Sequence, residues 1–180
     1  MKTRAPLAAA LFALLVLGGC ATSTISTFQK VSPSENNKVT ISSLVVTEKN
    51  METKKTPDAT EKAVADAVLT SLKENLNRKG LLADRENASF SLDLRVFHYN
   101  TTLFGWLSGG GVVRGDPQGL IVRVTLNEKN GSAIVQIDSM DGTGAMRGYR
   151  ILTTSVSEEL SNQIEKILKE GIAVGKTQSP

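Results

Sequence analysis

Apolar and polar residues alternate along three stretches of the chain, 89–99, 120–127 and 133–137. A period of two puts successive side chains on opposite faces and is typical of a strand with one buried face. The dipeptide Asn130-Gly131, between the last two stretches, favours a tight hairpin turn. An earlier stretch, 38–46, mixes valine, isoleucine and leucine with serine and threonine, and we expect it to form a first strand.

Two other stretches repeat apolar residues every three to four positions, which is typical of an amphipathic helix. The first opens at Thr56-Pro57-Asp58, where a hydroxyl, a proline and an acid suit a helix N-terminus. It ends at Lys79-Gly80, a typical helix stop. The second helix is expected to begin near Thr154-Ser155. The glycine-rich stretch 141–148 before it predicts a bulged or irregular extension.

The order of these elements predicts the architecture. A strand, a helix, three strands and a second helix (β-α-β-β-β-α) indicate an α+β fold, a two-layer sandwich. We expect a four-stranded, mainly antiparallel sheet with both helices on one face, because this arrangement buries the two apolar helix stripes together. A single domain is expected over 38–175, followed by a disordered tail over 176–180.

The N-terminus has the pattern of a bacterial export signal. Two basic residues precede the uncharged apolar run 7–17, which is shorter than the roughly 20 residues that cross a bilayer. The motif Leu17-Gly18-Gly19-Cys20 follows and resembles the lipobox of bacterial lipoproteins. A thiol there can carry diacylglycerol in a thioether, and small residues leave the bond before Cys20 open to a peptidase. The sequence predicts a signal peptide over 1–19 and a lipid on Cys20.

Cleavage makes Cys20 the first residue of the mature chain, and we expect its amine to be acylated too. Diacylglycerol and an N-acyl chain together hold a protein firmly on a membrane, because stable anchoring takes more than one chain. We expect no other cofactor. The next residue is Ala21 rather than aspartate, which resembles Gram-negative lipoproteins sent to the outer membrane. The rest of 20–37 is expected to be a flexible tether, because 21–29 is uncharged and rich in serine and threonine.

Charge and composition exclude several classes of function. The 180-residue chain has a net charge of +3, but removal of 1–19 takes two basic residues away and leaves it nearly neutral. Nucleic acid is therefore not expected as a partner. One cysteine and one histidine exclude a disulfide framework and any metal site built on cysteine or histidine pairs.

Catalytic candidates are few, and we expect no enzyme. His98 lies in a predicted strand with no carboxylate identifiable beside it, and Asp138 and Asp141 are expected to flank a turn in solvent. The chain has no G-x-S-x-G motif of a serine hydrolase. An aromatic content of 4% is poorly suited to lining a sugar cleft.

The scarce aromatic residues are concentrated in one place. Four of them fall within 97–106, at the start of a glycine-rich connection. Phe104, Trp106 and Leu107 either fold back against the sheet edge or form an apolar finger for a partner or a membrane surface. They are the candidate contact residues of the chain.

The architecture as a whole resembles small Gram-negative envelope lipoproteins, in particular YajG-like and DUF4410-like lipoproteins. The similarity spans about 38–170 and includes the helix end at 78–81, the strand from Ser89 and the run 105–111. These families imply no catalytic residues. The resemblance implies a lipid-anchored protein on the periplasmic face of the outer membrane, acting as a non-enzymatic binding or scaffold module with an envelope protein as partner.

Two alternatives remain open at this point. An auxiliary lipoprotein of a lipid-trafficking ABC transport system would need an apolar groove between the helices and the sheet. An uncharacterised envelope enzyme would need a cleft in which His98 lies beside an aspartate or a glutamate.

Overall fold

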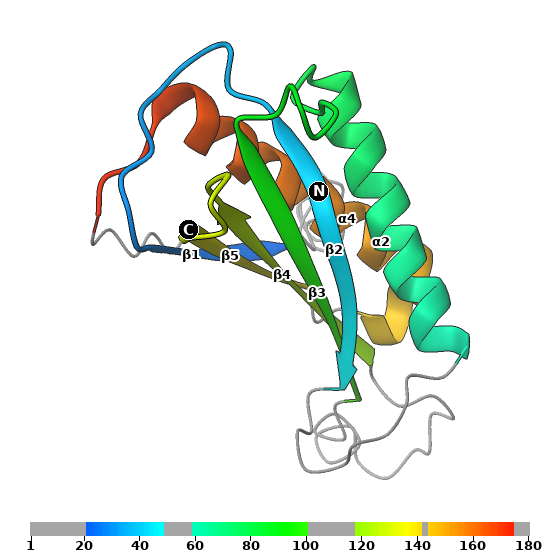
Figure 1. Ribbon diagram of the computed structural model, residues 1–180. Coiled ribbons are helices and arrows are strands. Elements are labelled where there is room, and N and C mark those ends of the chain that lie inside the picture. Colours follow the sequence, from blue (N-terminus) through cyan, green and yellow to red (C-terminus); the bar gives the residue numbers. More distant parts are fainter. Residues whose placement is uncertain (1–20, 49–58, 101–117, 142–143, 175–180) are drawn as a thin grey trace, which may run out of the picture.

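The computed structural model describes residues 21–48, 59–100, 118–141 and 144–174. Their elements are, in chain order, β1 (Thr22–Thr27), β2 (Val39–Glu48), α2 (Ala59–Arg78), β3 (Phe90–Asn100), β4 (Gln118–Asn127), β5 (Ala133–Asp141) and α4 (Gly144–Glu170). The strands form one sheet in the order β1-β5-β4-β3-β2. Figure 1 shows both helices on the same side of this sheet. The predicted α+β sandwich with two helices on one face is confirmed.

Strand pairing follows from the connections. β2 and β3 are parallel and are joined through α2, whereas the other neighbouring strands are antiparallel. At the predicted hairpin between β4 and β5, the N–H of Gly131 donates to the carbonyl of Glu128 at 2.9 Å. Gly131 has a φ of 87°, which glycine adopts without strain. The hairpin prediction is confirmed.

The core lies between the sheet and the two helices. The alternating apolar residues of β3 and β4 point into it, and so does the apolar stripe of each helix. Ser157, on the stripe of α4, is fully buried and donates its hydroxyl to the carbonyl of Val68 on α2 at 3.3 Å. The small side chain of Ser157 thus reaches the backbone of α2 directly. The largest side chains with almost no exposure are Leu72, Leu76, Leu92, Leu94, Leu120, Ile134, Ile137, Leu160, Ile164 and Leu168.

The end of α2 is the one that the sequence predicts. Gly80 takes a φ of 67°, and its N–H donates to the carbonyl of Asn77 at 2.9 Å. The N–H of Leu81 donates to the carbonyl of Leu76 at 2.9 Å, and both side chains are buried. These contacts form a Schellman motif, which satisfies the last carbonyls of the helix.

The sheet has five strands where the sequence analysis expects four. The additional strand is β1, which lies within the expected tether and pairs antiparallel with β5. Buried and exposed side chains alternate along this stretch: Ala21, Ser23 and Ile25 are buried, and Thr22 and Thr24 are exposed. The sequence pattern hides this alternation because serine and threonine occupy both faces. The stretch from Ala21 to Thr27 is therefore part of the domain and not a tether.

The rest of the expected tether also packs on the domain, at the C-terminus of α4. Val31 forms an antiparallel bridge with Ile172. The carbonyl of Leu168 accepts hydrogen bonds from the N–H of Ser34 and from Nδ2 of Asn37, each at 3.1 Å. The last carbonyls of a helix have no partner within the helix, so this stretch caps α4. The domain starts at Ala21, before the predicted boundary at residue 38.

The stretch 141–148 differs from the predicted irregular extension. Asp141 ends β5, and α4 already begins at Gly144, well before Thr154-Ser155. Glycine disfavours a helix by only about 1 kcal/mol, and the stretch also holds good helix formers such as alanine, methionine and arginine. Asp138 and Asp141 both lie within β5, so the prediction that they flank a turn is wrong. Among the described residues, no helix is long and apolar enough to cross a membrane.

Candidate functional site

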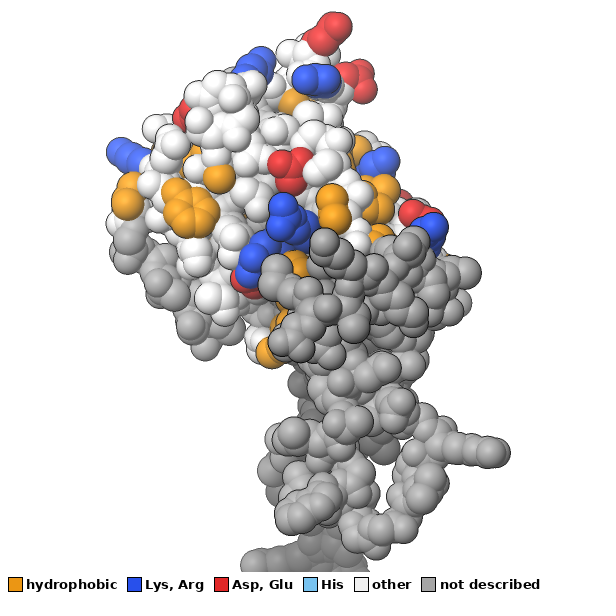
Figure 2. Space-filling model, turned by 60° about the horizontal axis from the view of Figure 1, so that its bottom comes forward, with side chains coloured by type: hydrophobic (Ala, Val, Ile, Leu, Met, Phe, Trp, Pro, Cys, Tyr) orange, Lys and Arg blue, Asp and Glu red, His pale blue; other side chains and the backbone are white. Residues whose placement is uncertain are grey.

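The candidate site is the outer face of the sheet, opposite the two helices. Strand register aligns the outward residues in rows that run across the strands. The first row, here called the apolar row, contains Phe97, Ile121 and Met140. The second, the arginine row, contains Val45, Arg95, Arg123 and Asp138. The third, the Asp93 row, contains Ser43, Asp93, Thr125 and Gln136. In Figure 2, which brings the bottom of the molecule forward, Lys and Arg side chains are grouped beside hydrophobic ones.

The apolar row lies at the end of the sheet where β3 ends and β4 begins. Phe97 and Ile121 are half-buried, and Met140 is 45% exposed. The register places Thr22, the first residue of β1, opposite Met140. The row therefore ends beside the first residue of β1.

The arginine row carries fixed charges. Arg123 holds Asp138 with two parallel hydrogen bonds, from Nε at 2.7 Å and from Nη2 at 2.9 Å. Its guanidinium carbon lies 5.7 Å from the ring centre of Phe97, close enough for a cation–π contact. The hydrogen bond to Asp138 raises the pKa of Arg123, against the opposing effect of burial. Arg95, directly opposite Arg123 in the register, is exposed.

The Asp93 row is organised by one carboxylate. Oδ1 of Asp93 accepts hydrogen bonds from the hydroxyls of Ser43 at 2.5 Å and Ser42 at 2.9 Å, and Oδ2 accepts one from Nδ2 of Asn127 at 2.8 Å. Burial raises the pKa of Asp93, but the hydrogen bonds from Ser43, Ser42 and Asn127, with the charge of Arg95, outweigh it and lower the pKa. Asp93 is thus held in its charged form.

A β-bulge makes this arrangement possible. The register between β2 and β3 shifts between Ile41 and Ser43, which leaves Ser42 as the extra residue. Successive side chains normally point to opposite faces of a strand, and the bulge brings two consecutive hydroxyls to the same carboxylate. The sequence analysis missed Asp93, Ser42 and Ser43 as a site. The signal was present in the Ser42-Ser43 pair, which interrupts the apolar alternation of β2.

Two hollows in the described surface lie near the start of β2. One of about 600 Å³ is lined by Thr40, Ile41, Ser42, Arg85, Ala88, Phe90, Ser91 and Lys129. A neighbouring one of about 420 Å³ shares Thr40, Ile41 and Arg85 and extends to the end of α2. Both are lined largely by polar residues. The larger lies at the sheet edge, and the smaller lies between the C-terminal part of α2 and the edge strand β2.

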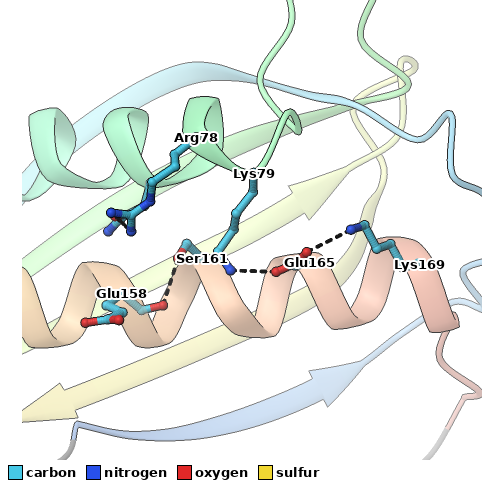
Figure 3. A network of polar contacts seen from close by, with 7 residues as sticks. Arg78, Lys79, Glu158, Ser161, Glu165 and Lys169 are labelled. Carbon is cyan, nitrogen blue, oxygen red and sulfur yellow. Dashed lines mark hydrogen bonds and ion pairs between the residues drawn. The ribbon is translucent and has the colours of Figure 1, made fainter.

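A second charged cluster ties the ends of the two helices together (Figure 3). Glu165 on α4 binds Nζ of Lys79 at 2.5 Å and Nζ of Lys169 at 2.8 Å. The hydrogen bonds from Lys169 and then Lys79 lower the pKa of Glu165. The side chains of Lys79 and Glu165 are 21% and 28% exposed, and the cluster joins α2 to α4. We assign this cluster a structural role.

The residues predicted as sites from the sequence lie outside the described residues. These are Leu17, Gly18, Gly19 and Cys20 of the lipobox, and the candidate contacts Phe104, Trp106 and Leu107. The described chain begins at the residue after Cys20, and the segment with the aromatic residues connects the end of β3 to the start of β4. No group of three His, Cys, Asp or Glu residues suited to a metal ion occurs in the described part.

His98 has a neighbour that the sequence analysis did not identify. The register of the parallel pair places Glu48 of β2 beside His98 of β3. On its other side the register partner is Leu120, which is fully buried. The side chains of Glu48 and His98 are outside the described part of the structure.

Comparison with known proteins assigns no family. No family model and no curated protein matches the chain. Among solved structures, a PelC dodecamer from Paraburkholderia phytofirmans is similar at 17% identity and a TM-score of 0.46, covering 77% of this chain and 93% of that one. A PDZ domain protein from Parabacteroides distasonis is similar at 10% identity and a TM-score of 0.39, covering 85% of this chain and 39% of that one.

A third similar structure is a neuraminyllactose-binding hemagglutinin homolog from Helicobacter pylori. It has 13% identity and a TM-score of 0.34, and the match covers 79% of this chain and 88% of that one. At these identities and TM-scores, none of the likenesses assigns an activity or a partner to this chain.

Proposed function

We propose that this protein is a lipid-anchored, non-enzymatic binding or scaffold module of the Gram-negative envelope, of the kind found among YajG-like and DUF4410-like lipoproteins. Diacylglycerol and an N-acyl chain on Cys20 hold it on the periplasmic face of the outer membrane. Fixing a domain at a membrane raises its effective concentration for partners in the same layer. The partner is an envelope protein, and Phe104, Trp106 and Leu107 are kept as candidate contacts.

One observation carries the binding role: the helices cover one face of the sheet, whereas the described residues leave the other face uncovered and preorganised. On that open face, hydrogen bonds fix the carboxylates of Asp93 and Asp138 before any partner arrives. These side chains then lose little conformational freedom when a partner binds, which favours binding.

The direction of the pKa shifts supports a non-enzymatic role. A general acid or base works best with a pKa near the working pH. The pKa of Asp93 is lowered and that of Arg123 is raised, so each shift keeps the group charged at neutral pH. Groups of this kind suit recognition by charge and hydrogen bonding better than proton transfer.

Crosslinking in intact cells tests the binding role. A photoreactive aromatic residue at Thr125, in the middle of the Asp93 row, is compared with the same residue at Lys73, exposed on α2. We expect one dominant crosslinked envelope protein from Thr125 and much weaker crosslinks from Lys73. Adducts that are no stronger from Thr125 than from Lys73, in variants with equal melting temperatures, would contradict the proposal.

The lipid-transport alternative finds little support in the described residues. It needs an apolar groove between helices and sheet, but the side chains there, such as Leu72, Leu94 and Leu160, are fully buried against one another.

The enzyme alternative now rests on the register position of Glu48 beside His98. A His98→Ala variant that keeps its crosslinked partner would agree with the proposed role.

A further inference from the structure

The described part of the chain begins directly after the proposed lipid attachment site. Ala21 is 7% exposed, and its N–H donates to the hydroxyl of Ser155 on α4 at 3.2 Å. The next residue, Thr22, is already paired with Met140 of β5. Fixed points on two elements therefore hold the chain one and two residues after Cys20, and no flexible spacer separates the anchor from the domain.

The reach of so short a connection is limited. Two residues span at most about 7 Å, so the Cα of Cys20 lies within that distance of the Cα of Thr22. Paired residues in an antiparallel ladder have Cα atoms about 5 Å apart, which places Met140 within about 12 Å of the acylated residue. The polar headgroup layer of one leaflet is about 5–8 Å deep, so Met140 is within reach of it.

The outer face of the sheet changes in character with distance from this end. The apolar row, with Phe97, Ile121 and Met140, comes first. Two residues further along each strand, about 7 Å away, comes the arginine row, with Arg95 exposed. The Asp93 row follows after the same interval. Apolar side chains, then cations and then a carboxylate are the sequence of groups that a bilayer surface favours with increasing distance from its hydrocarbon.

We propose that the apolar row and the arginine row rest on a phospholipid bilayer, with the apolar row at the base of the headgroups and Arg95 at the level of the phosphates. The occupant of this surface is the membrane to which Cys20 is anchored. The strands then run away from the membrane, and the β4–β5 turn at 128–132 lies farthest from it. This inference rests on the proposed lipidation of Cys20.

The orientation explains how one sheet face serves two contacts. The apolar and arginine rows contact lipid, whereas the Asp93 row stays above the headgroups and remains open to a protein partner. Because no spacer separates the anchor from the domain, the Asp93 row is held at a fixed height above the membrane. A protein partner then binds it from the side, parallel to the membrane plane.

Depth-dependent fluorescence quenching tests the orientation. The full chain, matured in a Gram-negative host, is reconstituted in phosphatidylethanolamine–phosphatidylglycerol vesicles that contain spin-labelled phospholipid. Cys20 is the chain's one cysteine, and its thiol is consumed in the thioether, so an introduced cysteine is the single site for an environment-sensitive dye. Met140→Cys is the test variant. Lys129→Cys, exposed in the turn about 25 Å away along β5, is the matched control.

We expect the dye at Met140→Cys to be quenched about twofold or more relative to the dye at Lys129→Cys, because only the former reaches the headgroup layer. If Met140→Cys does not fold, Thr24→Cys on the exposed side of β1 takes its place with the same expected order. Equal quenching, or stronger quenching at Lys129→Cys, in protein that floats with the vesicles would overturn the orientation alone. Protein that does not float with the vesicles would overturn both the orientation and the proposed lipid anchor.

Discussion

Asp93 is the residue on which the order of the open face depends most. Three side chains from two neighbouring strands, those of Ser42, Ser43 and Asn127, donate to its carboxylate. Its place in an alternating strand is predictable from the sequence. Its role is not, because the two serines reach it only through a bulge that depends on the pairing of β2 with β3.

Gly171 shows how a single residue fixes the stretch that the sequence analysis takes for a tether. Its φ is 76°, and a Cβ added to it would lie 2.7 Å from the carbonyl oxygen of Val31 and 2.9 Å from Cδ of Pro33. Only glycine lets the 31–33 stretch pack this closely on the end of α4. A glycine there suggests a helix end in the sequence, but it does not reveal which part of the chain packs against it.

Gly171→Ala is expected to destabilise the domain more than Gly80→Ala. Both positions have a positive φ, which costs a non-glycine residue about 1–2 kcal/mol, but a Cβ at Gly80 meets nothing within 4 Å. The Gly171 variant must also displace backbone, so we expect its loss of unfolding free energy to be about twice as large. Urea denaturation of both variants measures this. Equal losses would mean that 31–33 is not held against α4.

Among the elements, β1 changes the picture most. It turns the stretch after Cys20 from a spacer into an edge strand and makes the sheet five-stranded. The strands β3 and β4 and the first part of β5 are predictable because Leu, Val and Ile dominate their inward positions, whereas the last inward positions of β5 are Ser139 and Asp141. β1 is not, since only Ile25 among its inward positions is large and apolar.

The helix pair is held by its apolar stripes and by the Glu165 cluster, and the latter predicts a pH dependence. Lys169 and Lys79 lower the pKa of Glu165 in the folded state, so its contribution to stability is present above the ordinary glutamate pKa of about 4.3. That contribution is lost as the pH falls through the lowered pKa, because the carboxylate then becomes protonated.

Glu165→Gln is therefore expected to lower the melting temperature by roughly 1–3 °C at neutral pH, as befits partly exposed ion pairs. The difference from the unmodified protein should shrink as the pH falls toward about 3. Glu86→Gln, on an exposed turn, is the control and should change little at either pH. Melting curves across this pH range measure the difference in melting temperature. A difference for Glu165→Gln that stays the same in acid would contradict a role that depends on the charge of Glu165.

At the scale of the whole molecule, the sequence predicts the class of fold well and the arrangement of side chains on the outer sheet face poorly. Periodicity predicts the sheet, the helices and the faces they bury, because burial acts on every second or every third to fourth residue. The rows of the open face depend on register between strands that are distant in sequence, such as Arg95 with Arg123 and Thr22 with Met140. That register also links the start of the domain to the apolar row and so predicts the orientation on a membrane.

Lipid attachment at Cys20 is the central claim, and intact-mass analysis of the N-terminus tests it most directly. The full chain is expressed in a Gram-negative host and extracted from the membrane fraction, with Cys20→Ser as the control. We predict a mature chain that begins at Cys20 and carries the mass of diacylglycerol and one N-acyl chain, while the Cys20→Ser protein keeps residues 1–19 and carries no lipid. A chain from the unsubstituted protein that lacks lipid, or that begins at any other residue, would contradict the claim.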